Sequence, residues 1–284
     1  MTSQVIPLEH AGSATACLES GNVLWQRTGF FRVSVREQAL FSPDVLAPGK
    51  NVKNVSFNPA TGQMSGSSLE NEMAAALGGL LSRFSDAALA FVVRTCPEYA
   101  GEVSRGRTSF RPVEIAGRPS SWRKDDTRLH IDAFPATPSQ GRRILRVFAN
   151  VNPDERPRSW RIGDSFADVA RRFAPALRMP FPGAGTMLSV LRITKTPRSP
   201  YDAMMLQLHD RMKEDAAYQK TAPQTAFDFP AGSAWMAFTD AVSHAAMAGQ
   251  YQLEQTFLLP VGAMLDEQQS PLRILERLKG RTLL

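Results

Sequence analysis

Cysteine, tryptophan and tyrosine are scarce in this sequence, and long apolar runs are missing. Its 284 residues contain two cysteines, Cys17 and Cys96. Two thiols this far apart exclude a disulfide framework, a cysteine-rich zinc site and an iron–sulfur centre, and they suit a reducing compartment. The most apolar stretches, residues 87–93 and 257–265, are too short to cross a bilayer. We therefore expect a soluble, cytoplasmic protein.

Several sequence motifs are absent as well. The chain has no His-Glu-x-x-His pair, no phosphate-binding P-loop, no Gly-x-Ser-x-Gly elbow and no Gly-x-Gly-x-x-Gly after a strand. We therefore expect no zinc-protease, nucleotide-hydrolysing or serine-hydrolase chemistry. Only four Trp and four Tyr are available to stack on bases, and no nucleic-acid module is recognisable, so nucleic acid is not an expected partner.

Positive charge exceeds negative charge by six, which points to an anionic partner. Part of the surplus lies in residues 141–178, which hold nine arginines and four acidic residues. Arg156, Arg158 and Arg161 surround Trp160 in this segment. We interpret the segment as a lid over an acidic substrate.

A second surplus lies in the tail, where residues 271–284 carry four basic residues and one acidic residue. Apolar side chains are interleaved with these charges at Leu272, Ile274, Leu275 and Leu278. This pattern is typical of an amphipathic helix on an anionic membrane. We expect the tail to make peripheral contact with the cytoplasmic face of the inner membrane.

Apolar periodicity and turn residues outline the chain. Strands are predicted at residues 22–25, 30–35, 127–134, 143–151, 227–230, 233–238 and 250–259, and helices at residues 67–93, 163–173, 199–220 and 271–284. We expect one α+β domain over residues 1–284 with a mainly β core. N-terminal strands and a helix (residues 1–100) would pack on a core with a helical insert (101–262), which the basic tail (263–284) follows.

The most informative histidine is His130, in the sequence Leu-His-Ile-Asp. Residues two apart on a strand share a face, so His130 and Asp132 point one way while Leu129 and Ile131 point the other way. A histidine and a carboxylate on one face form two-thirds of the 2-His-1-carboxylate triad. That triad holds Fe(II) and leaves positions open for a co-substrate and O₂. A chance pairing on a surface strand is the alternative at this point.

His244 is the candidate for the third ligand. A Pro–Gly turn at residues 230–232, an apolar strand and a short connection precede it, and a further strand follows. Oxygenases with a double-stranded β-helix, a jelly-roll or cupin-like fold, place their distal histidine in this arrangement. We therefore expect that fold, with flanking helices and a metal site formed by His130, Asp132 and His244. His209, inside a predicted helix, is expected to be structural or solvent-facing.

If the metal is iron and 2-oxoglutarate is the co-substrate, a cation must bind the distal carboxylate of 2-oxoglutarate. Many enzymes of this fold place that cation shortly after the distal histidine, but residues 249–256 contain no Arg or Lys. The strand after the His-x-Asp loop offers Arg146 instead, and Arg128 shares a predicted strand face with His130. We expect Arg146, or else Arg128, to bind 2-oxoglutarate. An ordinary salt bridge is the alternative for each.

Longer motifs resemble a known family. The blocks that carry the resemblance are residues 129–135, 141–146, 148–153, 201–202, 208–210, 212–213, 218–219, 238–245, 249–250 and 254–257. Over about residues 100–262 the chain resembles the Kdo hydroxylase family. The resemblance implies an Fe(II)- and 2-oxoglutarate-dependent dioxygenase that also uses O₂, with His130, Asp132 and His244 as iron ligands.

The resemblance also implies a substrate. It is 3-deoxy-D-manno-oct-2-ulosonic acid (Kdo) attached to a lipid A precursor, hydroxylated at carbon 3 to give Ko with release of succinate and CO₂. Two other functions stay open. An oxygenase of the same fold could act on another anionic small molecule, or a non-enzymatic protein could bind its partner through a basic face.

Overall fold

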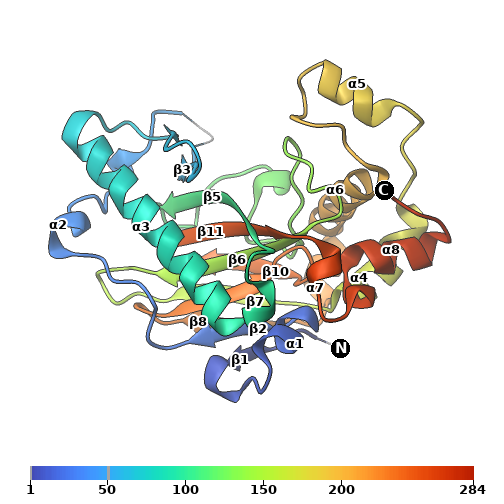
Figure 1. The fold of residues 1–284 in the computed structure, drawn as a ribbon, viewed down its shortest axis with the longest axis horizontal. Helices are drawn as coiled ribbons and strands as arrows, with labels where there is room; N and C mark the ends of the chain where they lie inside the picture. The colour runs from blue at the N-terminus through green and yellow to red at the C-terminus, as the bar shows by residue number, and fades with distance from the viewer. Residues whose placement is uncertain (1, 50–51) are drawn as a thin grey trace.

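The structure, a computed structural model, describes residues 2–49 and 52–284 and is built around two β-sheets (Figure 1). The larger sheet has the strand order β1-β2-β9-β6-β11-β5-β3-β4, and the smaller has the order β10-β7-β8. The large sheet contains β1 (Val5–Pro7), β2 (Val23–Gln26), β3 (Val55–Phe57), β4 (Met64–Ser65), β5 (Ser104–Arg111), β6 (Arg143–Asn150), β9 (Ala234–Phe238) and β11 (Gln252–Leu259). The small sheet contains β7 (Arg158–Ile162), β8 (Thr225–Phe229) and β10 (His244–Ala248).

Aromatic side chains fill the space between the two sheets. Phe148 of β6 and Trp235 of β9 stack with ring centroids 5.2 Å apart, and Trp160 of β7 meets Trp235 edge-on at 5.6 Å. Strand alternation accounts for this contact, because Trp160 is buried while its two neighbours on β7 are half-buried. Two facing, mainly antiparallel sheets form the double-stranded β-helix that the sequence predicted.

Helices flank the sheets at one face and one end (Figure 1). They are α1 (Ala14–Glu19), α2 (Val35–Gln38), α3 (Asn71–Thr95), α4 (Phe166–Phe173), α5 (Ala184–Val190), α6 (Pro200–Glu214), α7 (Ala216–Thr221) and α8 (Pro271–Lys279). Helix α6 begins at a capping box, formed by Ser199 and Asp202. It ends at Glu214, and the side chain of the next residue, Asp215, caps the start of α7. The helix predicted over residues 199–220 is therefore two helices.

Helix α3 is long and apolar enough to cross a membrane, judged by length and composition alone. Residues 87–93 of this helix form an unbroken apolar run in the sequence. Here α3 packs against β3, β5 and β11 and buries one face, which includes Leu77, Leu81 and Phe84. The apolar residues of α3 therefore serve the core of the fold.

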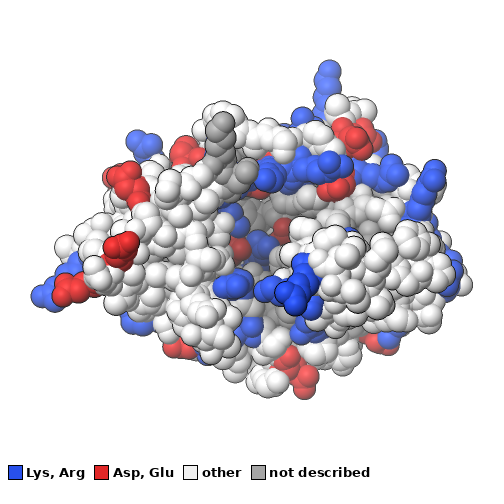
Figure 2. Space-filling view, turned by 90° about the horizontal axis from the view of Figure 1, so that it is seen from above, with Lys and Arg blue, Asp and Glu red and all other residues white. Residues whose placement is uncertain are grey.

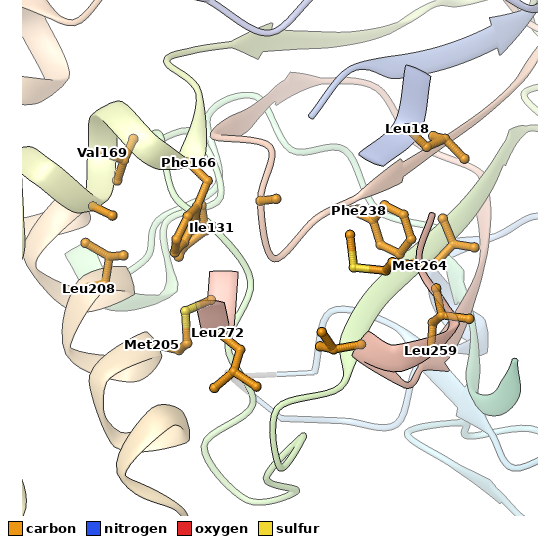
Figure 3. Close-up of a cluster of buried hydrophobic side chains, with 14 of the residues drawn as sticks. Leu18, Ile131, Phe166, Val169, Met205, Leu208, Phe238, Leu259, Met264 and Leu272 are labelled. Atoms are coloured by element: carbon orange, nitrogen blue, oxygen red, sulfur yellow. The ribbon is translucent and has the colours of Figure 1, made fainter. Parts of the chain in front are cut away.

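Helix α8 also uses its apolar face inside the protein. Leu272 and Leu275 are 2% and 0% exposed, and Leu272 belongs to the same buried cluster as Ile131, Phe166 and Leu208 (Figure 3). The expectation that these leucines face a membrane is wrong, because the amphipathic pattern serves packing beside α4.

The strand predictions need further corrections. None of the predicted ranges covers β5, β7, β10 or the short strands β1, β3 and β4. Residues 30–35 form no strand, and residues 127–134 contribute a single β-bridge, between His130 and His244. The lid interpretation of the arginine-rich segment is also wrong. Arg158 and Trp160 lie on β7, an inner wall of the β-helix, and Arg158 is only 3% exposed.

Candidate metal centre

A backbone bridge brings the predicted metal ligands together. His130 and His244 exchange backbone N–H···O hydrogen bonds of 3.0 and 2.9 Å, although they lie 114 residues apart in the sequence. The Asp132 N–H donates to the Thr239 carbonyl at 2.8 Å, which fixes the third residue. Ile131 is fully buried in the core (Figure 3), so the intervening side chain points away from the ligands, as the alternation predicted.

Both imidazoles are oriented for metal binding. One ligand atom from each of His130, Asp132 and His244 lies within 4.8 Å of the others. The Nδ1 atoms of the two histidines lie 2.8 Å from the Arg128 and Val242 carbonyls. Nδ1 therefore carries the proton and donates it, and Nε2 keeps its lone pair for a metal. Burial lowers the pKa of both imidazoles, which keeps them neutral.

The Asp132 carboxylate is charged and incompletely satisfied. Burial works against ionisation, but the positive charge of Arg146 holds the pKa of Asp132 well below its usual range. Arg146 Nε lies 3.1 Å from Asp132 Oδ2, yet its N–H is not aimed at that oxygen. Within the described ranges, Oδ2 is buried and accepts no hydrogen bond. A divalent cation would satisfy this oxygen, so two neutral imidazoles and one carboxylate fit Fe(II).

Arg146 belongs to a chain of buried charges. Its Nη1 lies 2.8 Å from Glu254 Oε1, and Glu254 Oε2 accepts from Arg111 Nε at 3.0 Å. The Arg146 guanidinium therefore lies between two carboxylates, that of buried Glu254 and that of half-buried Asp132. Its position suits it to hold the Asp132 carboxylate in place beside the two histidines.

The ligands lie in a cavity of about 480 Å³. Its lining includes six basic residues, which are Arg111, Arg123, Lys124, Arg146, Arg158 and Lys213, and four acidic residues, which are Asp126, Asp132, Asp210 and Glu254. Figure 2 shows a hollow on one face of the molecule with Lys and Arg gathered around and inside it. This cavity can accept a ligand that carries several negative charges.

Arg158 is a cavity residue whose role the sequence analysis missed. Its side chain is buried, and its Nη1 donates to the Gly249 carbonyl at 2.5 Å. Its Nε has no hydrogen-bond partner, and its guanidinium makes no ion pair, among the residues that the structure describes. Burial lowers the pKa of Arg158 most, and the positive charge of Arg111 lowers it further, so that the pKa is about 9. An anionic ligand would complete the surroundings of this cation.

Arg128 and His209 differ from their predicted roles. Arg128 does not line the cavity, since it donates to the Lys213 carbonyl at 2.8 Å and lies 3.4 Å from Asp125 Oδ2. The alternation that placed it beside His130 requires a strand that does not form there. His209 lines the cavity instead, with its ring 5.5 Å from that of His130. The Leu-His-Asp motif at residues 208–210 was the signal that could have shown this.

Comparisons with known proteins agree with this geometry. Residues 2–282 match the family model of 3-deoxy-D-manno-oct-2-ulosonic acid (Kdo) hydroxylase. Crystal structures of the Kdo hydroxylase KdoO, a non-heme Fe(II) alphaketoglutarate-dependent dioxygenase, are 43% identical in sequence. The complex with alphaketoglutarate and Fe(III) has a TM-score of 0.94 and covers 99% of this chain and 98% of that one. The complex with cobalt(II) has a TM-score of 0.93, with 98% and 97% covered. The complex with succinate and Fe(III) has a TM-score of 0.92 and the same coverage as the cobalt complex. No curated protein matches the chain.

Proposed function

This chain belongs to the Kdo hydroxylase family, and from that premise we propose that its substrate is Kdo attached to a lipid A precursor, hydroxylated at carbon 3 to give Ko. The enzyme is an Fe(II)- and 2-oxoglutarate-dependent dioxygenase that hydroxylates Kdo. The basic cavity supports the lipid-linked substrate, because Kdo carries a carboxylate and lipid A precursors carry phosphates.

We assign iron binding to His130, Asp132 and His244. The spacing of their ligand atoms, the donated Nδ1 protons and the unsatisfied Asp132 oxygen support this assignment. Bound iron supplies the oxidation chemistry with O₂ and 2-oxoglutarate. The chain positions the ligands and excludes water, since Trp160 stacks on the His244 ring at 5.0 Å between centroids.

We assign the distal carboxylate of 2-oxoglutarate to Arg158 rather than to Arg146. Strand pairing places Ile162 of β7 opposite His244, and Arg158 lies four residues further along, about 13 Å away. Co-substrate at the metal and an extended arginine side chain together span such a distance. Arg146 is less suited, because the carboxylates of Asp132 and Glu254 already neutralise it.

Basic residues of the cavity wall would receive the sugar and its lipid-linked phosphates. Arg123 is two-thirds exposed, and the Lys213 ammonium donates to the Arg123 carbonyl at 3.1 Å. A cytoplasmic location, peripheral to the inner membrane, is also part of the proposal. Both cysteines are free thiols, which suits a reducing compartment.

The experiment combines the purified protein with Fe(II), 2-oxoglutarate and Kdo-linked lipid A precursor. We expect a product whose mass is greater than that of the substrate by one oxygen atom. We also expect one molecule of succinate to be released for each molecule of product. His130→Ala abolishes both, while His10→Ala, an exposed histidine outside the cavity lining, retains both. Persistence of the product in His130→Ala contradicts the site. Turnover of free sugar acids without turnover of lipid-linked Kdo indicates a different anionic substrate. If the wild-type protein binds no iron but binds nucleic acid with salt-sensitive affinity, it is a basic binding protein and not an enzyme.

A further inference from the structure

An exposed arm around α5 stands beside the cavity. Residues 178–198, called here the α5 arm, connect α4 to α6 in the sequence and project from the body of the protein (Figure 1). The base of the arm is fixed, because the Lys195 N–H donates to the Ala136 carbonyl at 2.9 Å and Arg198 Nη2 donates to the Pro135 carbonyl at 2.6 Å. Pro135 lines the metal cavity, so the arm stands at the cavity wall.

The α5 arm exposes a cluster of large apolar side chains. Five of them are between 48% and 76% exposed, namely Phe181, Met187, Val190, Leu191 and Ile193. Within the arm only Thr194 is buried, so the apolar side chains are not needed for internal packing. Apolar clusters exposed in this way mark interaction surfaces.

The charge of the α5 arm indicates what it contacts. The arm contains Arg178, Arg192, Lys195 and Arg198, and no acidic residue occurs between Asp168 and Asp202. Apolar side chains among cations, without acids, complement the headgroup region of an anionic bilayer. A second copy of the chain, docked by two-fold symmetry, would place these cations against themselves, which is unfavourable.

We propose that the α5 arm docks the enzyme on an anionic phospholipid bilayer. Its apolar side chains enter the boundary between headgroups and acyl chains, and its cations contact phosphates. The purpose of docking rests on the proposed function, because a Kdo-lipid keeps its acyl chains in the bilayer while its sugar enters the cavity. Figure 2 looks onto the hollow from the side on which α5 stands in Figure 1. The arm thus takes the role that the sequence analysis expected of the tail.

A vesicle-binding experiment tests the proposal. Wild-type protein is sedimented with phosphatidylcholine vesicles that contain or lack phosphatidylglycerol, at low and high salt. The test variant is Leu191→Glu/Arg192→Glu. Its matched control, Val35→Glu/Arg36→Glu, makes the same charge change on α2 by replacing an 83% exposed valine and the arginine that follows it. Helix α2 lies at the far end of the molecule from α5 (Figure 1).

We expect wild-type protein to bind the anionic vesicles and to be released by salt. One cation near an anionic surface is worth about a fivefold gain in partition, so the test variant should lose at least tenfold while the control binds like wild type. Wild-type binding by the test variant, or an equal loss in the control, overturns the proposal. A concentration-dependent dimer that the test variant abolishes also overturns it and assigns the arm to a second copy.

Turnover separates this proposal from the proposed function. The test variant should lose turnover of Kdo-lipid in vesicles and keep turnover of the deacylated, water-soluble substrate. If the test variant turns over each of the two substrates as fast as wild type does, the result counts against docking. Wild-type protein that binds anionic vesicles but hydroxylates neither substrate supports docking and contradicts the proposed function.

Discussion

Replacing Arg158 by glutamine tests the assignment of the 2-oxoglutarate site. The guanidinium is buried and held by one bond to the Gly249 carbonyl, and its Nε is unpartnered among the described residues. Hydrogen bonds between charged groups contribute about 1.5–3 kcal/mol each. Loss of the guanidinium should therefore cost about 2–4 kcal/mol, which raises the Kd of 2-oxoglutarate by roughly 30- to 1,000-fold.

The assay compares two keto acids by calorimetric titration into the Mn(II)-loaded protein. One is 2-oxoglutarate, and the other is 2-oxopentanoate, which has the same chain length but lacks the distal carboxylate. Wild-type protein should prefer 2-oxoglutarate strongly. Arg158→Gln should lose that preference and keep its affinity for Mn(II), because only the partner of the distal carboxylate has been removed.

Arg146→Gln, titrated at a Mn(II) concentration that saturates its weakened metal site, is the matched comparison for this experiment. It makes the same substitution in the same cavity, on β6 and beside Asp132. An unchanged preference for 2-oxoglutarate in Arg158→Gln, combined with its loss in Arg146→Gln, would refute the reasoning. The distal carboxylate would then belong to Arg146, as the sequence analysis expected.

Three further predictions concern the metal and the fold. Arg146→Gln should weaken Mn(II) binding by about 10- to 100-fold in a metal titration, because the metal-ligating carboxylate loses the cation beside it. Gly249→Ala should lower the free energy of unfolding in urea by about 1–3 kcal/mol, since φ is +105° and a Cβ would lie 2.8 Å from a backbone oxygen. Gly262→Ala, with open space at its Cβ, is its control, and an equal loss there would contradict the argument. Leu275→Ala should lower the free energy of unfolding by about 2–5 kcal/mol, because the Leu275 side chain is fully buried. Leu278 is 39% exposed, so Leu278→Ala should lower it far less. Equal losses of stability in the two variants would show that α8 does not pack as described.

The grouping of the three candidate metal ligands could be predicted from the sequence because its signals are local. Strand-like alternation placed His130 and Asp132 together, and a turn, a strand and a loop led to His244. The alternation held for the side chains although residues 127–134 form only one bridge. It failed at Arg128, two residues away, where the backbone already departs from a strand.

The burial of Arg158 in the cavity wall could not be predicted from composition. Arginine clusters usually lie on solvated surfaces, and the charge of this segment concealed the alternation of buried residues on β7. Burial of a cation depends on the facing sheet, which local sequence does not describe. The tail shows the same limit, because one amphipathic pattern serves a membrane helix and a core helix equally.

The bridge between His130 and His244 has a consequence for how the protein persists in the cell. A metal bound by both histidines cross-links two points 114 residues apart. Because the unfolded chain does not hold these ligands together, the metal binds the folded state and stabilises it by mass action, by about 2.7 kcal/mol at a free metal concentration 100 times the Kd. The metal site can form only after His244 has been synthesised. Until the site holds a metal, no metal joins His130 to His244. Iron supply would therefore govern the lifetime of the folded protein as well as its turnover.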